Sequence, residues 1–119
     1  MTTDRKTPRG LGAAGRKLWH SIVDEYDIEE HEALLLVEAC RVSDRLDALA
    51  TAQKGASLTV ENARGDVVAS PYLVESRQQA IVLSRLIASL RLPTGDEEDE
   101  KRPQRRGGAR GAYQPRVVA

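Results

Sequence analysis

The sequence predicts a mainly α-helical protein with three main helices and a short β-hairpin between the second and the third. Apolar residues recur at three- and four-residue spacing in three long stretches, which is the pattern of amphipathic helices. Alternation of apolar and polar residues, the pattern of a strand, occurs between the second and third stretches. The chain has 119 residues, which is room for one small domain.

The first helix is expected within residues 11–26. Gly12 and Gly15 weaken its first turn, which favours a start nearer Ala14. We interpret Trp19 as a core residue rather than a ligand platform, because it shares the apolar stripe of this helix. The stripe consists of Leu11, Leu18, Trp19, Ile22, Val23 and Tyr26.

The second helix is expected over residues 28–52, with Asp27 as N-cap and Glu30 completing an Asp version of the capping box. Apolar residues lie on nearly all sides around residues 33–42, which indicates burial against more than one neighbour. Cys40 lies among them and is interpreted as a small core residue. The regular stripe of this helix consists of Leu35, Ala39, Val42, Leu46 and Leu49.

The next interval predicts a β-hairpin within residues 57–69. Residues 57–61 and part of 66–69 alternate between apolar and polar, and residues 62–65 offer a turn in which Gly65 accepts positive φ. A lone two-stranded hairpin is marginal in water. We therefore expect this one to lean on the helices or on a neighbouring subunit.

The third helix is expected over residues 71–90. Ser70 suits the N-cap, Pro71 suits the first helical position, and Pro93 stops the helix soon after its end. The apolar side chains of this helix include Leu73, Ala80, Leu83, Leu86, Ile87 and Leu90.

Charge is strongly segregated along the chain, although 18 Lys+Arg balance 18 Asp+Glu. We expect residues 1–10 to form a flexible basic arm, residues 11–93 the helical core and oligomerisation domain, and residues 94–119 a disordered tail. The tail is acidic at residues 96–100 and basic after them. With no Phe, one Trp and three Tyr, the core should be thin, which favours stabilisation by self-association.

The sequence predicts neither an enzyme nor a metal or cofactor site. It has no phosphate-binding GxxxxGK[ST] loop, and its carboxylates fall on helix faces or in the run at residues 96–100. One cysteine and two histidines, His20 and His31, are too few to close a metal site at ligand spacing. No run approaches the roughly 18 apolar residues of a membrane span, and the first ten residues lack a secretory apolar segment. We expect neither membrane insertion nor secretion.

Two clusters of Lys and Arg predict contacts with the phosphates of double-stranded DNA. The first cluster should dominate, because Arg16 and Lys17 sit on a predicted helix that holds them in a fixed array, whereas a flexible tail loses entropy on binding. Several copies in one assembly would multiply the modest charge of each chain. The candidate residues are Arg5, Lys6, Arg9, Arg16 and Lys17 near the N-terminus, and Lys101, Arg102, Arg105, Arg106 and Arg110 in the tail.

The order of these parts resembles that of phage terminase small subunits from long-tailed phages, which have a helix–helix–hairpin–helix plan. The matching segments are LGAAGRKLW, ALLLVEACRVSDRLD, LTVENARGDVVASP and the ending SLRLP, within residues 8–95. Two positions depart from the family. Residues 28–32 lack the Thr and Asp common near the start of the second helix, and Arg91 stands where Gly is common. Both departures concern helix caps.

The resemblance implies a DNA-packaging initiation factor without a catalytic site. Such a protein would bind double-stranded viral DNA, assemble as a homo-oligomeric ring and regulate the large terminase subunit, which supplies ATPase and nuclease activities. It would act in the cytoplasm of the bacterial host. We expect the ring to form through the second and third helices, with Leu35, Val42, Leu46, Leu49, Leu83 and Ile87 as candidate residues.

Two other classes of protein fit the same features. One is a small helical DNA-binding transcriptional regulator that acts as a dimer, in which residues 11–26 and the start of the second helix form a unit like a helix-turn-helix. The other is a helical adaptor that binds an acidic protein through its basic tails. The number of subunits and the salt dependence of DNA binding separate the three classes.

Overall fold

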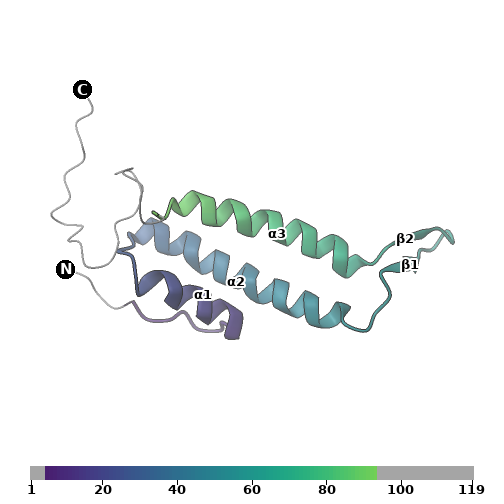
Figure 1. Cartoon of the computed structure of the whole chain (residues 1–119), viewed down its shortest axis with the longest axis horizontal. Coiled ribbons are helices and arrows are strands. Elements are labelled where there is room, and N and C mark those ends of the chain that lie inside the picture. The colour runs from purple at the N-terminus through teal and green to yellow at the C-terminus, as the bar shows by residue number, and fades with distance from the viewer. Residues whose placement is uncertain (1–4, 94–119) are drawn as a thin grey trace, which may run out of the picture.

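The computed structural model describes residues 5–93 and contains the predicted elements in the predicted order (Figure 1). The chain is mainly helical, with a two-stranded antiparallel hairpin between its second and third helices. The predicted disorder of residues 94–119 lies outside the described residues. The elements are α1 (Ala13–Val23), α2 (Glu30–Gln53), β1 (Thr59–Glu61), β2 (Val67–Ala69) and α3 (Pro71–Leu90).

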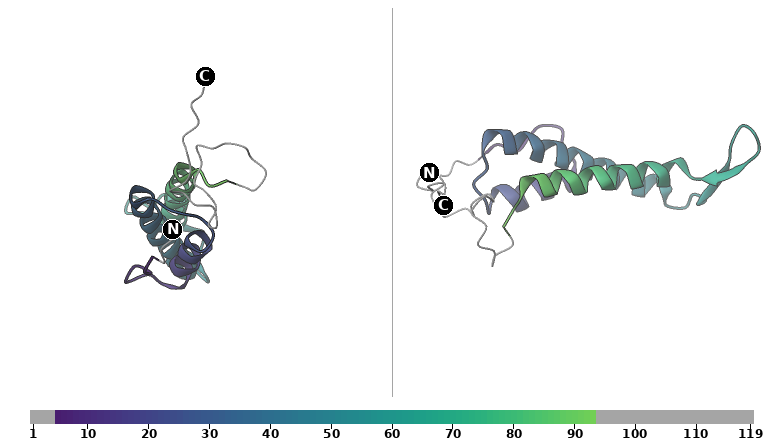
Figure 2. Two further views of the ribbon diagram at one scale, coloured as in Figure 1. Left: turned by 90° about the vertical axis from the view of Figure 1, so that its left-hand side faces the viewer. Right: turned by 90° about the horizontal axis from the view of Figure 1, so that it is seen from above.

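The two long helices lie side by side over their whole length, and α1 packs beside the first half of α2 only (Figures 1 and 2). The molecule therefore has a three-helix end and a two-helix end that continues into the hairpin. The main core lies at the three-helix end, where it also receives the last turn of α3. The buried members of this core are Leu11, Trp19, Ile22, Val23, Tyr26, Leu36, Cys40 and Leu90.

The first helix is shorter than residues 11–26, because the buried residues at both ends of its predicted stripe lie outside the helix. Leu11 precedes the N-cap Gly12, and Tyr26 follows the C-cap Asp24. The hydroxyl of Tyr26 donates a hydrogen bond of 2.9 Å to the carbonyl oxygen of Pro93. This bond joins the chain after α1 to the chain after α3.

The second helix begins two residues later than predicted, and its N-cap is Glu29 rather than Asp27. The backbone N–H of Glu29 donates to Oε1 of Glu32 at 2.7 Å, which is the reciprocal bond of a capping box. Asp27 is instead buried in the connection between the helices. A capping box of two acids three residues apart is therefore present, but it is formed by Glu29 and Glu32 and not by Asp27 and Glu30.

The predicted start of α3 is confirmed, and Ser70 links it to the end of α2. The Oγ of Ser70 accepts a hydrogen bond from the backbone N–H of Tyr72 at 3.2 Å, and Pro71 occupies the first helical position. The same hydroxyl donates to Oε1 of Gln53 at 2.7 Å. The base of the hairpin is therefore held at the point where α2 ends and α3 begins.

The hairpin has the predicted turn, and the structure adds its register. Val60 pairs with Val68, and the turn is closed by a hydrogen bond of 2.9 Å from the Gly65 N–H to the Asn62 carbonyl. Gly65 has φ of 86°, which is the left-handed position of a three-residue hairpin loop. The hairpin projects beyond the ends of the helices (Figure 2), and Val67 is 70% exposed.

Arg91 ends α3 in the left-handed conformation, with φ of 55° and ψ of 46°. A side chain in this conformation is strained, whereas glycine adopts it freely. Arg91 therefore occupies a position where a glycine is physically favoured.

The first prediction concerns this backbone strain. Arg91→Gly should unfold at a higher temperature than Arg91→Ala, with a free energy of unfolding larger by about 1 kcal/mol. Both variants lack the Arg91 side chain, so the comparison isolates the backbone term. Thermal unfolding followed by circular dichroism measures it, and equal stability of the two variants would contradict the assignment.

Candidate nucleic-acid interface

The N-terminal segment from Arg5 to Gly10 runs alongside α1 rather than away from it (Figure 1). Arg5 holds its outer end, because one guanidinium nitrogen donates to the Ile28 carbonyl at 2.9 Å and another lies 3.3 Å from the Glu30 carboxylate. Farther along, Thr7 Oγ1 lies 3.3 Å from Nε2 of His20 on α1. We call this segment together with α1 the arm–α1 surface. In the part of the predicted flexible arm that the structure describes, Arg5 is thus bonded to the start of α2 and the residue Ile28 before it, and Thr7 to α1.

The five predicted cations of this surface fall into two groups. Arg5 is anchored as above, and Arg16 donates from Nη1 to the Leu11 carbonyl at 2.6 Å, which fixes the turn before α1. Lys6, Arg9 and Lys17 are exposed and have no hydrogen bond or ion pair with any part of the chain that the structure describes. These three ammonium and guanidinium groups are therefore available to phosphates.

The predicted cations of the tail, Lys101, Arg102, Arg105, Arg106 and Arg110, lie outside the described residues.

The position of α1 depends on a carboxylate from α2. The two oxygens of Asp44 accept hydrogen bonds of 2.7 Å each from the backbone N–H groups of Gly12 and Gly15. These are donors of the first turn of α1, which has no side-chain cap of its own. Asp44 thus caps α1 from the neighbouring helix, and side-chain caps of this kind contribute about 0.5–2 kcal/mol.

Gly15 allows α1 and α2 to approach closely at this point. A Cβ atom built on Gly15 would lie 2.8 Å from the Cys40 carbonyl oxygen and 2.5 Å from Oδ2 of Asp44. Sequence reasoning treated Gly12 and Gly15 only as weak points of the helix and missed Asp44. The available signal was the place of Gly15 on the buried stripe, four residues from both Leu11 and Trp19.

The Cys40 thiol lies in the core beneath this contact and is fully buried. Burial, and to a smaller degree the negative charge of Asp44, raises the pKa of Cys40 from 9.0 to about 11. A thiol that stays protonated is a poor nucleophile and a poor metal ligand. This supports the interpretation of Cys40 as a core residue.

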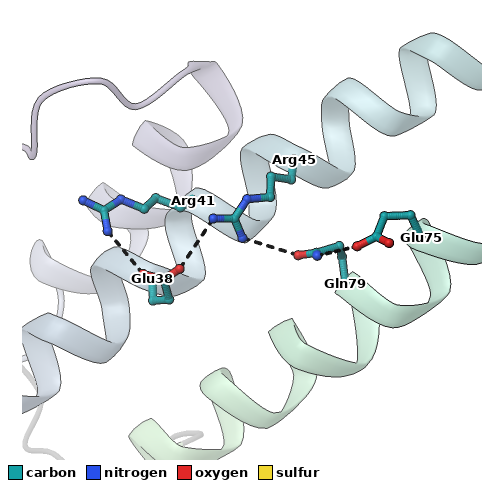
Figure 3. Close-up of polar contacts among 5 residues, drawn as sticks. All are labelled: Glu38, Arg41, Arg45, Glu75 and Gln79. Atoms are coloured by element: carbon teal, nitrogen blue, oxygen red, sulfur yellow. Dashed lines mark hydrogen bonds and ion pairs between the residues drawn. The ribbon is translucent and has the colours of Figure 1, made fainter. Parts of the chain in front are cut away.

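A polar chain connects α2 to α3 on another face of the molecule (Figure 3). The Glu38 carboxylate lies 3.2 Å from Arg41 and 3.6 Å from Arg45. Arg45 in turn donates to Gln79 at 3.5 Å, and Gln79 donates to Glu75 at 2.8 Å. Exposed pairs of this kind contribute little to stability, but here they hold the guanidinium of Arg45 toward α3.

The side chains predicted to form the oligomer interface are already partly or fully buried within one chain. Val42 is 1% exposed, so its surface is covered by the chain itself. The other five, Leu35, Leu46, Leu49, Leu83 and Ile87, are half-buried. Their contact with a second copy stays a prediction.

Within residues 5–93, no group of three His, Cys, Asp or Glu side chains is placed to hold a metal ion. None of the described helices combines the length and the apolar character needed to cross a membrane.

The second prediction concerns the contact at Gly15. Alanine normally stabilises a helix interior relative to glycine, but Gly15→Ala should lower the free energy of unfolding by about 1–3 kcal/mol because the methyl group meets the Cys40 carbonyl. Ala13→Gly, at an exposed position of the same turn, serves as the control for ordinary helix propensity. Chemical denaturation followed by the fluorescence of buried Trp19 measures both, and a stabilising Gly15→Ala would contradict the packing.

The third prediction concerns pH. The folded protein keeps the Cys40 proton up to a pKa of about 11, whereas the unfolded chain loses it near 9.0. The stabilisation is therefore complete below pH 9 and is lost as the pH rises toward 11, by at most about 1.4 kcal/mol per pH unit. Cys40→Ala should show a shallower loss over the same interval. Parallel slopes in the two proteins would show that the thiol is not shifted.

Comparison of the chain with protein-family models, with curated proteins and with solved structures finds no match. Membership of a family is therefore not shown. The resemblance to phage terminase small subunits rests on the order and spacing of the sequence features alone.

Proposed function

We propose that this protein is a phage terminase small subunit, which binds double-stranded viral DNA as a homo-oligomeric ring and regulates the large terminase subunit. The observation that carries the DNA-binding part is the arm–α1 surface. It presents Lys6, Arg9 and Lys17 without partners, on a backbone that is already held in place. The regulation of a large subunit rests on the resemblance in sequence.

The attachment of the arm favours DNA binding because it reduces the entropy that ordering would cost. A free chain loses about 1–2 kcal/mol for each residue whose backbone becomes fixed. The bonds of Arg5 and Thr7 fix the arm before DNA arrives. Phosphate contacts then release counterions, and this gain is not opposed by a large loss of backbone entropy.

The weak packing of the two-helix end supports assembly. Beyond the reach of α1, α2 and α3 have only each other to pack against, and the hairpin extends past both. Large apolar side chains are exposed there, among them Leu58, Val67 and Val74. Soluble monomers rarely leave contiguous apolar surface uncovered, so a second copy is a natural partner.

The arrangement of α1 and α2 disfavours the alternative of a dimeric transcriptional regulator. The recognition helix of a helix-turn-helix crosses its partner steeply after a turn of three or four residues. Here α1 and α2 lie alongside each other in opposite directions, with residues 24–29 between them (Figure 1). The adaptor alternative requires that the arm–α1 surface bind a protein rather than DNA.

The fourth prediction tests the arm–α1 surface. Changing Lys6, Arg9 and Lys17 together to Gln should weaken duplex binding and reduce the slope of log K against log salt by up to about 3 for each bound chain. The matched control changes Arg41, Lys54 and Arg64 to Gln, because it removes the same charge elsewhere. Fluorescence anisotropy with one duplex at two salt concentrations measures both.

Removing residues 101–119 should cause a smaller loss of affinity that does not depend on DNA sequence, because cations that contact phosphates alone do not read bases. Loss of nearly all affinity in this deletion, with normal binding by the Gln variant of the arm–α1 surface, would place the site in the tail. A wild-type dimer with tight sequence-specific binding would support the regulator, and absence of DNA binding the adaptor.

A further inference from the structure

A groove lies between α2 and α3, with a volume of about 380 Å³. Its lining residues are Arg45, Ala48, Leu49 and Ala52 from α2, and Glu75 and Gln79 from α3. The volume is more than twice the roughly 150 Å³ of a cavity that accommodates benzene. The groove therefore has room for more than one aliphatic side chain.

The α2 residues of the groove have the spacing of a packing hole. Positions 45, 48, 49 and 52 are i, i+3, i+4 and i+7, which is the diamond of four residues that receives a knob from a facing helix. Ala48 and Ala52 keep it open because they have only a methyl group. Arg45 does not fill the groove, since its guanidinium is held by Glu38 and Gln79 (Figure 3).

We infer that the groove receives Ile81, from the Val74–Ile81 stripe on α3 of a second copy of this chain, so that the proposed oligomer assembles knob into hole; this inference rests on the proposed function. Val74 and Ile81 are seven residues apart and so lie on one face of α3, where they are 38% and 42% exposed. Both are β-branched and stiff, which suits a knob.

Charge at the edges agrees with this pairing. Arg77 and Arg85 flank Ile81 at i−4 and i+4, and both are exposed. Glu75 stands at the edge of the groove and is also exposed. When the stripe enters the groove of another chain, one of these cations can approach this carboxylate, while Arg45, the cation that lines the groove, stays paired with Glu38.

The stripe and the groove are different surfaces of the same chain, so the contact is heterologous. Each chain uses its stripe on one neighbour and its groove on the other. Such contacts continue until the rotation closes a ring, whereas a contact between identical surfaces would stop at a dimer. A ring of this chain would thus be built from one repeated contact between a stripe and a groove.

The experiment uses one variant that removes the stripe and one that fills the groove. Ile81→Asp should abolish assembly because a charge would have to be buried, and Ala48→Trp should do so by occupying the hole. Both positions are exposed, so each variant should fold, which circular dichroism checks. The control is Leu34→Asp, at another exposed apolar position of α2 that does not line the groove.

Native mass spectrometry at micromolar concentration gives the result. We expect a wild-type ring, a Leu34→Asp ring, monomers of each test variant alone, and a 1:1 dimer when the two test variants are mixed. The mixture retains one good stripe and one good groove, so it forms one contact and stops.

Two outcomes separate the failure of this inference from that of the proposed function. A wild-type protein that is monomeric overturns both. A wild-type ring that survives Ile81→Asp and Ala48→Trp, or whose two test variants fail to pair when mixed, overturns the groove and leaves the ring standing. Dissociation by Leu34→Asp as well would show that the contact is not confined to the groove, and would also overturn it.

Discussion

The described structure depends most on the close approach of α1 to α2 at Gly15. Without a Cβ there, the backbone of α1 comes against the carbonyl of Cys40, and the carboxylate of Asp44 reaches two N–H groups of the first turn of α1. The contact decides which face of α1 is buried, so that Trp19 enters the core. It therefore also decides which face, with Lys17, is left to solvent.

The two ends of the molecule differ in the number of elements that cover the core. At the three-helix end, the buried residues come from all three helices, and the bond from Tyr26 to Pro93 closes it. At the other end, two helices cannot surround the apolar residues that they carry, and the hairpin adds exposed valines. The three-helix end thus carries the candidate phosphate contacts, and the two-helix end carries the surfaces that a second copy would cover.

Local sequence signals predicted most of the fold. The apolar period placed three helices, and the alternation before Asn62 and after Gly65 placed the hairpin, because both depend on neighbours in the chain. The errors lie at the first and second helices. Leu11 and Tyr26 continue the apolar stripe of α1 without being helical, because irregular backbone can also point a side chain into a core. Capping chemistry was available at Asp27 and at Glu29, and periodicity does not choose between them.

The sequence by itself determined the kind and order of the elements, the presence of basic clusters and a content of only one cysteine and two histidines. Only the tertiary structure decided which cations are available, because the partners of Arg5 and Arg16 include backbone carbonyls that no side-chain pattern shows. It also decided that Asp44 caps a helix 29 residues away in the chain, and that α2 carries an unfilled hole. Such features arise where two elements meet, and their distances are set by the packing of both.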